Sequence, residues 1–148
     1  MFFRVSNCAV HRHGCFNRSG CLRDRTIIAV MTYTFARVGA VVALTVEDYF
    51  SQKERWWLRL HEKNGKLNEM PCNHKLEEFL DAYINAAGIA DVRKGPLFRS
   101  AMGKIGALTG KPLLRGDVWR MVRRRAADAG IETAIGCDTF RATGLQII

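Results

Sequence analysis

Residues 55–71 read RWWLRLHEKNGKLNEMP, and they carry the clearest local structural signal in the chain. The run Arg55–Leu60 is rich in aromatic residues and is typical of a β-strand, and Leu67–Pro71 follows a short polar segment. Between them, Asn64-Gly65 is a strong hairpin signal because both turn positions require a positive φ. The stretch therefore predicts an antiparallel β-hairpin, with Lys63 at its turn.

Helical patterns flank this hairpin on both sides. Between residues 75 and 87 apolar side chains recur at helical spacing, and Gly88 ends the pattern. Residues 93–116 are rich in Gly and Lys and contain two prolines, which favours a loop. The expected helices cover residues 22–37, 38–44, 75–87 and 117–130, with a last one starting near residue 139. These elements predict an α+β fold, mainly helical with a small antiparallel β-hairpin or three-stranded sheet, and incomplete at the C-terminus because the chain stops inside its last helix.

Two of the helices carry more detailed expectations. In the first, Ile27, Ile28, Met31 and Phe35 are expected to face the core. In the helix at 117–130, Asp117 is expected to be the N-cap, and Gly130 is expected to end the helix. The apolar residues of this helix are expected to form a buried stripe, and three arginines then share the opposite side: Arg120, Arg123 and Arg124.

The positive charge of the chain is concentrated in one tract. The sequence has 23 Lys and Arg against 14 Asp and Glu, a formal net charge of +9. Residues 93–125 contain ten basic residues and one acid, so this tract alone nets +9, and the remaining 13 basic and 13 acidic residues cancel. Such a tract favours a polyanionic partner such as nucleic acid, with a solvated basic surface as the alternative.

Composition excludes several classes of protein. With 48% hydrophobic and 25% charged residues the chain is ordinary globular material, and no apolar run approaches the ~18 residues of a membrane span. The N-terminus lacks an apolar core of signal-peptide length. Five cysteines with no disulfide-scaffold spacing fit a reducing compartment, so we expect a cytoplasmic protein without a membrane partner.

Two motifs suggest a cofactor site, but neither matches the residue pattern that such a site requires. Residues 1–21 contain the pattern C-x2-H-x-H-x-C-x5-C, which matches no common zinc module, so we expect a divergent, poorly ordered extension and no metal site. Residues 103–111 (GKIGALTGK) suggest a phosphate loop, but Ile105 replaces its first glycine and Pro112 follows where Ser or Thr must bind magnesium. We therefore expect no cofactor, and in particular no nucleotide cofactor.

A different constellation suits a single phosphodiester. Arg37 lies at the end of one predicted helix, Lys63 at the hairpin turn, and Arg141 in the first turn of the last helix, one turn after Asp138. Arginine offers a planar fork for non-bridging oxygens, and lysine is a compact, titratable donor.

On the basis of these residues and the motifs around them, the chain resembles the catalytic domain of the tyrosine recombinases, the phage integrase family. The resemblance covers about residues 20–148, so residues 22–148 are taken as a partial catalytic domain. It rests on an ordered series: the ARVGA box, the Trp-rich strand, the K-N-G-K hairpin ending in M-P, an amphipathic helix, PLF, an Arg-rich helix ending in AGI, and TFRATG.

The resemblance implies a function and roles for these residues. In the family a tyrosine attacks a DNA phosphodiester and forms a 3′-phosphotyrosyl link, without ATP or metal. Arg37 and Arg141 would clamp the phosphate, and Lys63 would help to protonate the leaving 5′-oxygen. Such groups neutralise the charge of a phosphorane-like transition state. The implied partners are double-stranded DNA and other recombinase protomers, and the implied location is the nucleoid of a bacterial cytoplasm.

The sequence also departs from the family pattern. Asp138 stands where the family has the histidine of H-x-x-R, and an Asp suits the N-cap of the last helix. Ala40 stands where many relatives have an acid. The nucleophilic tyrosine would follow the residues present, and Tyr33, Tyr49 and Tyr83 are expected to be core or strand residues. We therefore expect a DNA-binding recombinase fragment that is inactive alone.

Two alternatives remain open. One is a non-catalytic DNA-binding module in which the basic tract grips backbone phosphates, through Arg120, Arg123, Arg124, Lys104 and Lys111. The other is a remnant of a mobile element without a function.

Overall fold

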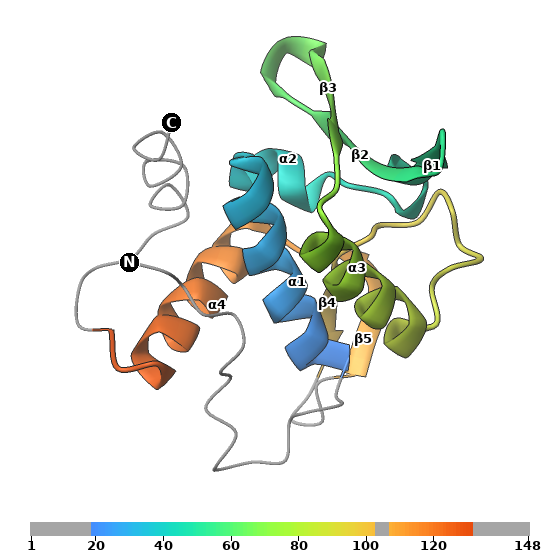
Figure 1. Ribbon diagram of the computed structural model, residues 1–148. Coiled ribbons are helices and arrows are strands. Elements are labelled where there is room, and N and C mark those ends of the chain that lie inside the picture. The colour runs from blue at the N-terminus through green and yellow to red at the C-terminus, as the bar shows by residue number, and fades with distance from the viewer. Residues whose placement is uncertain (1–18, 103–106, 132–148) are drawn as a thin grey trace.

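The computed structural model describes residues 19–102 and 107–131 of the 148-residue chain. Lys104, Asp138, Arg141 and the expected last helix lie outside these ranges. The elements in chain order are α1 (Ser19–Thr34), α2 (Val38–Val42), the short 3-10 turn η1 (Val46–Asp48), β1 (Tyr49–Gln52), β2 (Arg55–His61), the turn η2 (Lys63–Gly65), β3 (Leu67–Pro71), α3 (His74–Ala87), β4 (Arg99–Met102), β5 (Ala107–Pro112) and α4 (Arg115–Asp128) (Figure 1). This mixture of helices with small antiparallel sheets confirms the predicted α+β class.

Helix α1 is the centre of the core. Five consecutive residues, Ile27–Met31, are buried, so the helix is enclosed on all sides rather than on one face. It packs against α3 on one side, and α4 lies on its other side (Figure 1). The helix begins at Ser19, three residues before the predicted start, and Cys21 in its first turns is buried. Phe35 lies beyond the end of the helix and is only partly buried, so its prediction as a core residue of this helix was wrong.

The three-stranded sheet contains the predicted hairpin. Its strand order is β1-β2-β3, antiparallel throughout, with Leu58 opposite Met70 and His61 opposite Leu67. At the turn, Asn64 has a φ of 66° and Gly65 a φ of 73°, as the Asn-Gly signal predicts. The inward residues Leu58 and Leu60 are fully buried, which fixes the register of β2 against the helices.

The expected loop at 93–116 contains a second hairpin, so that prediction was wrong. Strands β4 and β5 pair antiparallel, with an irregularity between Arg99 and Ala101. Apart from Leu108, which is partly buried against the core, their residues are small, polar or exposed. The hydroxyls of Ser100 and Thr109 lie 2.6 Å apart in a cross-strand hydrogen bond. The hairpin is held by backbone pairing, by this polar contact and by a single apolar side chain, Leu108. The sequence therefore lacks the apolar alternation that is typical of a half-buried strand.

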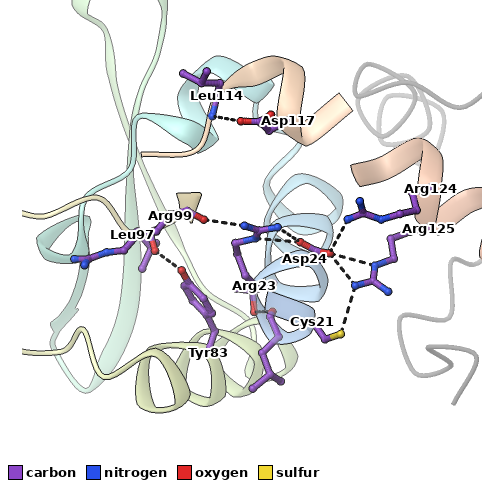
Figure 2. Close-up of polar contacts among 12 residues, drawn as sticks. Cys21, Arg23, Asp24, Tyr83, Leu97, Arg99, Leu114, Asp117, Arg124 and Arg125 are labelled. Carbon is purple, nitrogen blue, oxygen red and sulfur yellow. Dashed lines mark hydrogen bonds and ion pairs between the residues drawn. The ribbon is translucent and has the colours of Figure 1, made fainter. Parts of the chain in front are cut away.

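Helix α4 begins two residues before the predicted N-cap. Asp117 is its third residue, and its carboxylate accepts a hydrogen bond from the backbone N–H of Leu114 at 3.4 Å (Figure 2). Asp117 therefore caps the helix from inside, as the acidic member of a capping box does. Gly130 takes a positive φ of 73° just past the helix, as expected. Within the described residues, the helices are too short or too polar to cross a membrane.

Candidate phosphate-binding site

Arg37 is placed by a sharp turn between the first two helices. Phe35 has a φ of 55°, unusual for a bulky residue, and redirects the chain at the end of α1. Arg37 is then the extended N-cap of α2, and its carbonyl oxygen accepts hydrogen bonds from the N–H groups of Ala40 and Val41 at 3.0 and 3.1 Å. Because the backbone of Arg37 is held in this way, its exposed side chain projects from a fixed point.

Lys63 is placed by the hairpin turn of the three-stranded sheet. The N–H of Glu62 donates to the carbonyl oxygen of Lys66 at 2.7 Å, which closes the turn across its ends. Lys63, Asn64 and Lys66 are all exposed at its tip. The turn stands at the α2 end of the sheet (Figure 1), so its lysines can face the start of that helix.

Two adjoining hollows bring these segments together. One, of about 440 Å³, is lined by Arg37, Glu62, Lys63, Asn64, Lys66 and Asn68. The other, of about 530 Å³, is lined by Arg37, Val38, Gly39, Ala40, His61, Glu62, Lys63 and Arg115. Arg37, Glu62 and Lys63 are common to both, so each hollow has three Arg or Lys side chains against one carboxylate. This excess of cations suits an anion.

The structure thus brings together two of the predicted site residues and adds two that sequence reasoning missed. Arg115 was counted only as part of the basic tract, and His61 only as a strand residue. His61 Nε2 lies 3.2 Å from the buried carboxylate of Asp48, which also accepts a hydrogen bond from the Thr45 N–H at 2.9 Å. A one-dimensional pattern does not show that β2 ends beside α2, so nothing marked either residue in advance.

The basic side of α4 carries less free charge than its sequence suggests. Arg120 pairs with Asp117, and Arg124 lies 3.7 Å from the buried carboxylate of Asp24. The guanidinium of Arg123 lies over the ring of Trp119, 4.8 Å from its centroid. Of the other residues predicted to bind DNA, Lys111 is exposed on β5.

Arg125 makes its ion pair with a buried carboxylate, so it is not one of the free surface charges of α4. It donates to Asp24 Oδ2 at 2.8 Å, while Arg23 donates to the other oxygen of the same carboxylate at 2.8 Å (Figure 2). Burial alone lowers the pKa of Arg125, but the hydrogen bond and charge of Asp24 outweigh it and raise that pKa. The last residue of the basic tract therefore joins α4 to α1.

None of the three tyrosines of the chain lines either hollow. Tyr83 is fully buried, donates to the carbonyl oxygen of Leu97 at 2.7 Å, and has a pKa raised by burial to about 12. Tyr49 is buried and donates to Asp81 at 3.0 Å, and burial with that carboxylate raises its pKa. Tyr33 is 37% exposed near the end of α1, so it is not the core or strand residue that the sequence predicted.

The helical core, the small antiparallel sheets and the hairpin turn together form the fold of a tyrosine recombinase catalytic domain, and solved recombinase structures match it. The XerH site-specific recombinase bound to palindromic difH substrate has a TM-score of 0.65 at 18% identity, over 83% of this chain and 33% of that one. The XerA recombinase has a TM-score of 0.65 at 21% identity, over 82% of this chain and 41% of that one.

The chain belongs to the phage integrase family, whose model matches residues 12–146. It is 26% identical over 120 residues to the tyrosine recombinase XerD of Staphylococcus haemolyticus, covering 80% of this chain and 38% of that protein. It is 28% identical over 114 residues to the tyrosine recombinase XerC of Roseiflexus castenholzii, covering 74% of this chain and 34% of that protein. The chain thus spans little more than a third of the length of these relatives.

Proposed function

We propose that this chain binds double-stranded DNA through the sugar-phosphate backbone, with Arg37 and Lys63 as the phosphate-contacting pair. One observation carries the proposal: the two side chains come from distant segments and line the same two hollows. Among the described residues no carboxylate lies within 4.0 Å of the charged nitrogens of either side chain. Cations that make no ion pair within this distance are suited to a phosphate.

The chemistry of the pair supports a phosphodiester in particular. The guanidinium of Arg37 can donate two parallel hydrogen bonds to the non-bridging oxygens, and the ammonium of Lys63 can donate to a bridging oxygen. Arg141 would be the second arginine of the clamp, with Asp138 in the position of the family's histidine, and both lie outside the described residues. The similar proteins are named tyrosine recombinases, and the XerH structure is of a site-specific recombinase bound to its palindromic difH substrate.

We further propose that these 148 residues alone bind DNA without cleaving it. Tyr49 and Tyr83 are buried, and each hydroxyl already donates to an oxygen of the protein. Tyr33 does not line either hollow. A nucleophile must lie within reach of the phosphorus that the cations hold. The tyrosines present are therefore not suited to form a phosphotyrosyl link at the Arg37–Lys63 site.

The alternative is a non-catalytic module that grips DNA through the basic side of α4. The pairing of Arg120 with Asp117 and of Arg124 with Asp24 argues against α4 as the main contact. In that alternative, loss of Arg123 and Lys111 would weaken DNA binding more than loss of Arg37 and Lys63. The two proposals are therefore separable by the same binding assay.

The test of DNA binding is fluorescence anisotropy with a short labelled duplex, from about 50 to about 200 mM salt. Each phosphate contact contributes about 0.9 to the slope of log affinity against log salt. Arg37→Ala and Lys63→Ala should each reduce the slope by about that amount. Arg55→Ala and Lys75→Ala are matched controls, since both residues are exposed and lie outside the hollows. Equal effects of the site variants and the controls would contradict the proposed site.

The test of cleavage uses a nicked suicide duplex, from which a strand-cleaving recombinase cannot release its covalent link. The protein should give no denaturant-resistant complex with this DNA. A complex that survives denaturant, and that disappears when one of the three tyrosines is changed to Phe, would show that the chain cleaves DNA by itself.

A further inference from the structure

Arg115 is the one cation of the second hollow that comes from a third part of the fold. It is the first residue of α4, whereas the other residues of that hollow come from α2, its N-cap and the hairpin. Its side chain is exposed, and no carboxylate among the described residues lies within 4.0 Å of its guanidinium. In this it differs from Arg120, Arg124 and Arg125 on the same helix, each of which pairs with an acid.

Gly39 leaves the space in which the guanidinium of Arg115 lies. A Cβ atom on Gly39 would lie 2.6 Å from Nη2, 3.0 Å from Cζ and 3.1 Å from Nε of Arg115. All three atoms belong to the guanidinium, so this group lies directly against the backbone of α2. Only glycine leaves that space, and the backbone of Gly39 does not have a positive φ that would require glycine for another reason.

We propose that Arg115, admitted by Gly39, binds a second phosphate of the same DNA strand in the hollow next to the one that Arg37 and Lys63 hold. This inference rests on the proposed phosphate site. Because the two hollows share Arg37, Glu62 and Lys63, a strand with a phosphate in one hollow runs past the other. Arg115 therefore fixes the path of the strand across the site, since two phosphate contacts define a line and a single contact does not. This makes α4 part of the phosphate site through its first residue and not through its arginine-rich side.

The experiment measures the salt dependence of DNA binding for Arg115→Ala, Gly39→Ala and the double variant. Arg115→Ala should flatten the slope of log affinity against log salt by about 0.9, the contribution of one phosphate. Gly39→Ala should have the same effect although it removes no charge, because the new methyl group displaces the guanidinium. The double variant should equal either single variant, since both remove one contact.

The controls separate this contact from folding and from the main site. Alanine favours a helix over glycine, and the atoms displaced by Gly39→Ala are the far end of a flexible side chain, so both single variants should keep the wild-type thermal melt. Arg55→Ala, an exposed arginine of the sheet outside both hollows, should keep the wild-type slope.

Three outcomes would overturn the inference. If Arg115→Ala keeps the wild-type slope while Arg37→Ala and Lys63→Ala flatten it, Arg115 binds no phosphate although the proposed function stands. If Gly39→Ala keeps the wild-type slope, or if its effect adds to that of Arg115→Ala, Gly39 does not place the arginine. If the wild-type chain does not bind DNA even at low salt, the proposed function fails and this inference fails with it.

Discussion

Asp24→Asn tests whether a buried carboxylate joins α1 to α4. The Asp24 side chain is 3% exposed and lies 2.8 Å from Arg23, 2.8 Å from Arg125 and 3.7 Å from Arg124 (Figure 2). Asparagine keeps the size and one acceptor but removes the charge, which leaves the buried Arg23 without its counterion. Removing one partner of a buried ion pair costs about 3–5 kcal/mol.

We expect the lower end of that range, about 3 kcal/mol. The amide oxygen of the substituted side chain can still accept one of the hydrogen bonds, and the Arg23 guanidinium also donates to the carbonyl oxygen of Arg99 at 2.9 Å. For a chain of this length the melting temperature should fall by about 2–4 °C per kcal/mol, which is about 6–12 °C in total. Urea unfolding followed by circular dichroism measures the free energy directly.

The matched control is Glu69→Gln, which removes the charge of an exposed pair. Glu69 lies 3.1 Å from Arg59, with side chains 45% and 36% exposed, so its loss should cost less than about 1 kcal/mol. If Asp24→Asn were no more destabilising than this control, with an unchanged urea m value, the network would not hold the two helices together.

Other predictions concern the turn and the buried titratable groups. Gly65→Ala should destabilise the protein by about 1 kcal/mol in urea, because its φ is 73°, whereas Asn64→Gly should be nearly neutral. Burial, with the charges of Glu77 and Asp81, raises the pKa of Cys72 to about 12, so at a pH of about 8.5 this thiol should react with iodoacetamide at least about a hundredfold more slowly in the native protein than in urea. The raised pKa values of Cys72 and Tyr83 mean that the folded state keeps protons that the unfolded chain releases, so the urea midpoint should fall as the pH rises from about 9 to about 12; a constant midpoint would contradict this.

The elements that the sequence predicted well are those with strong local signals. Asn64-Gly65 predicted the turn because only a few residues adopt a positive φ, and Gly88 ended α3 for the same reason, with a φ of 65°. The β4-β5 hairpin was missed because its pairing depends on backbone hydrogen bonds and on Ser100 and Thr109 facing each other. A pattern of hydrophobicity contains no information about such a contact.

The residues of the candidate site also differ in whether the sequence alone could identify them. Arg37 and Lys63 could be selected from the sequence because each stands in a recognisable box, and the fold then brings them into the same hollows. Arg115 could not be selected, because its position depends on a space left by Gly39 in another helix. A glycine inside a short apolar helix is a weak signal by itself, since it also occurs where no side chain needs the space.

The fold places the arginines of the basic tract in two different surroundings. Along α4, Asp117 pairs with Arg120, and Asp24 pairs with Arg125 and lies 3.7 Å from Arg124; the Asp24–Arg125 pair is buried enough to act on stability. Arg115, at the first position of the same helix, has no carboxylate within 4.0 Å among the described residues and lines the second hollow, beside Arg37 and Lys63. Removing charge at Arg125 should therefore lower the free energy of unfolding, whereas removing it at Arg115 should change DNA affinity and its salt dependence and leave stability nearly constant. Either substitution removes one positive charge from the tract, so the different expected effects come from the position of each arginine relative to the nearby acids.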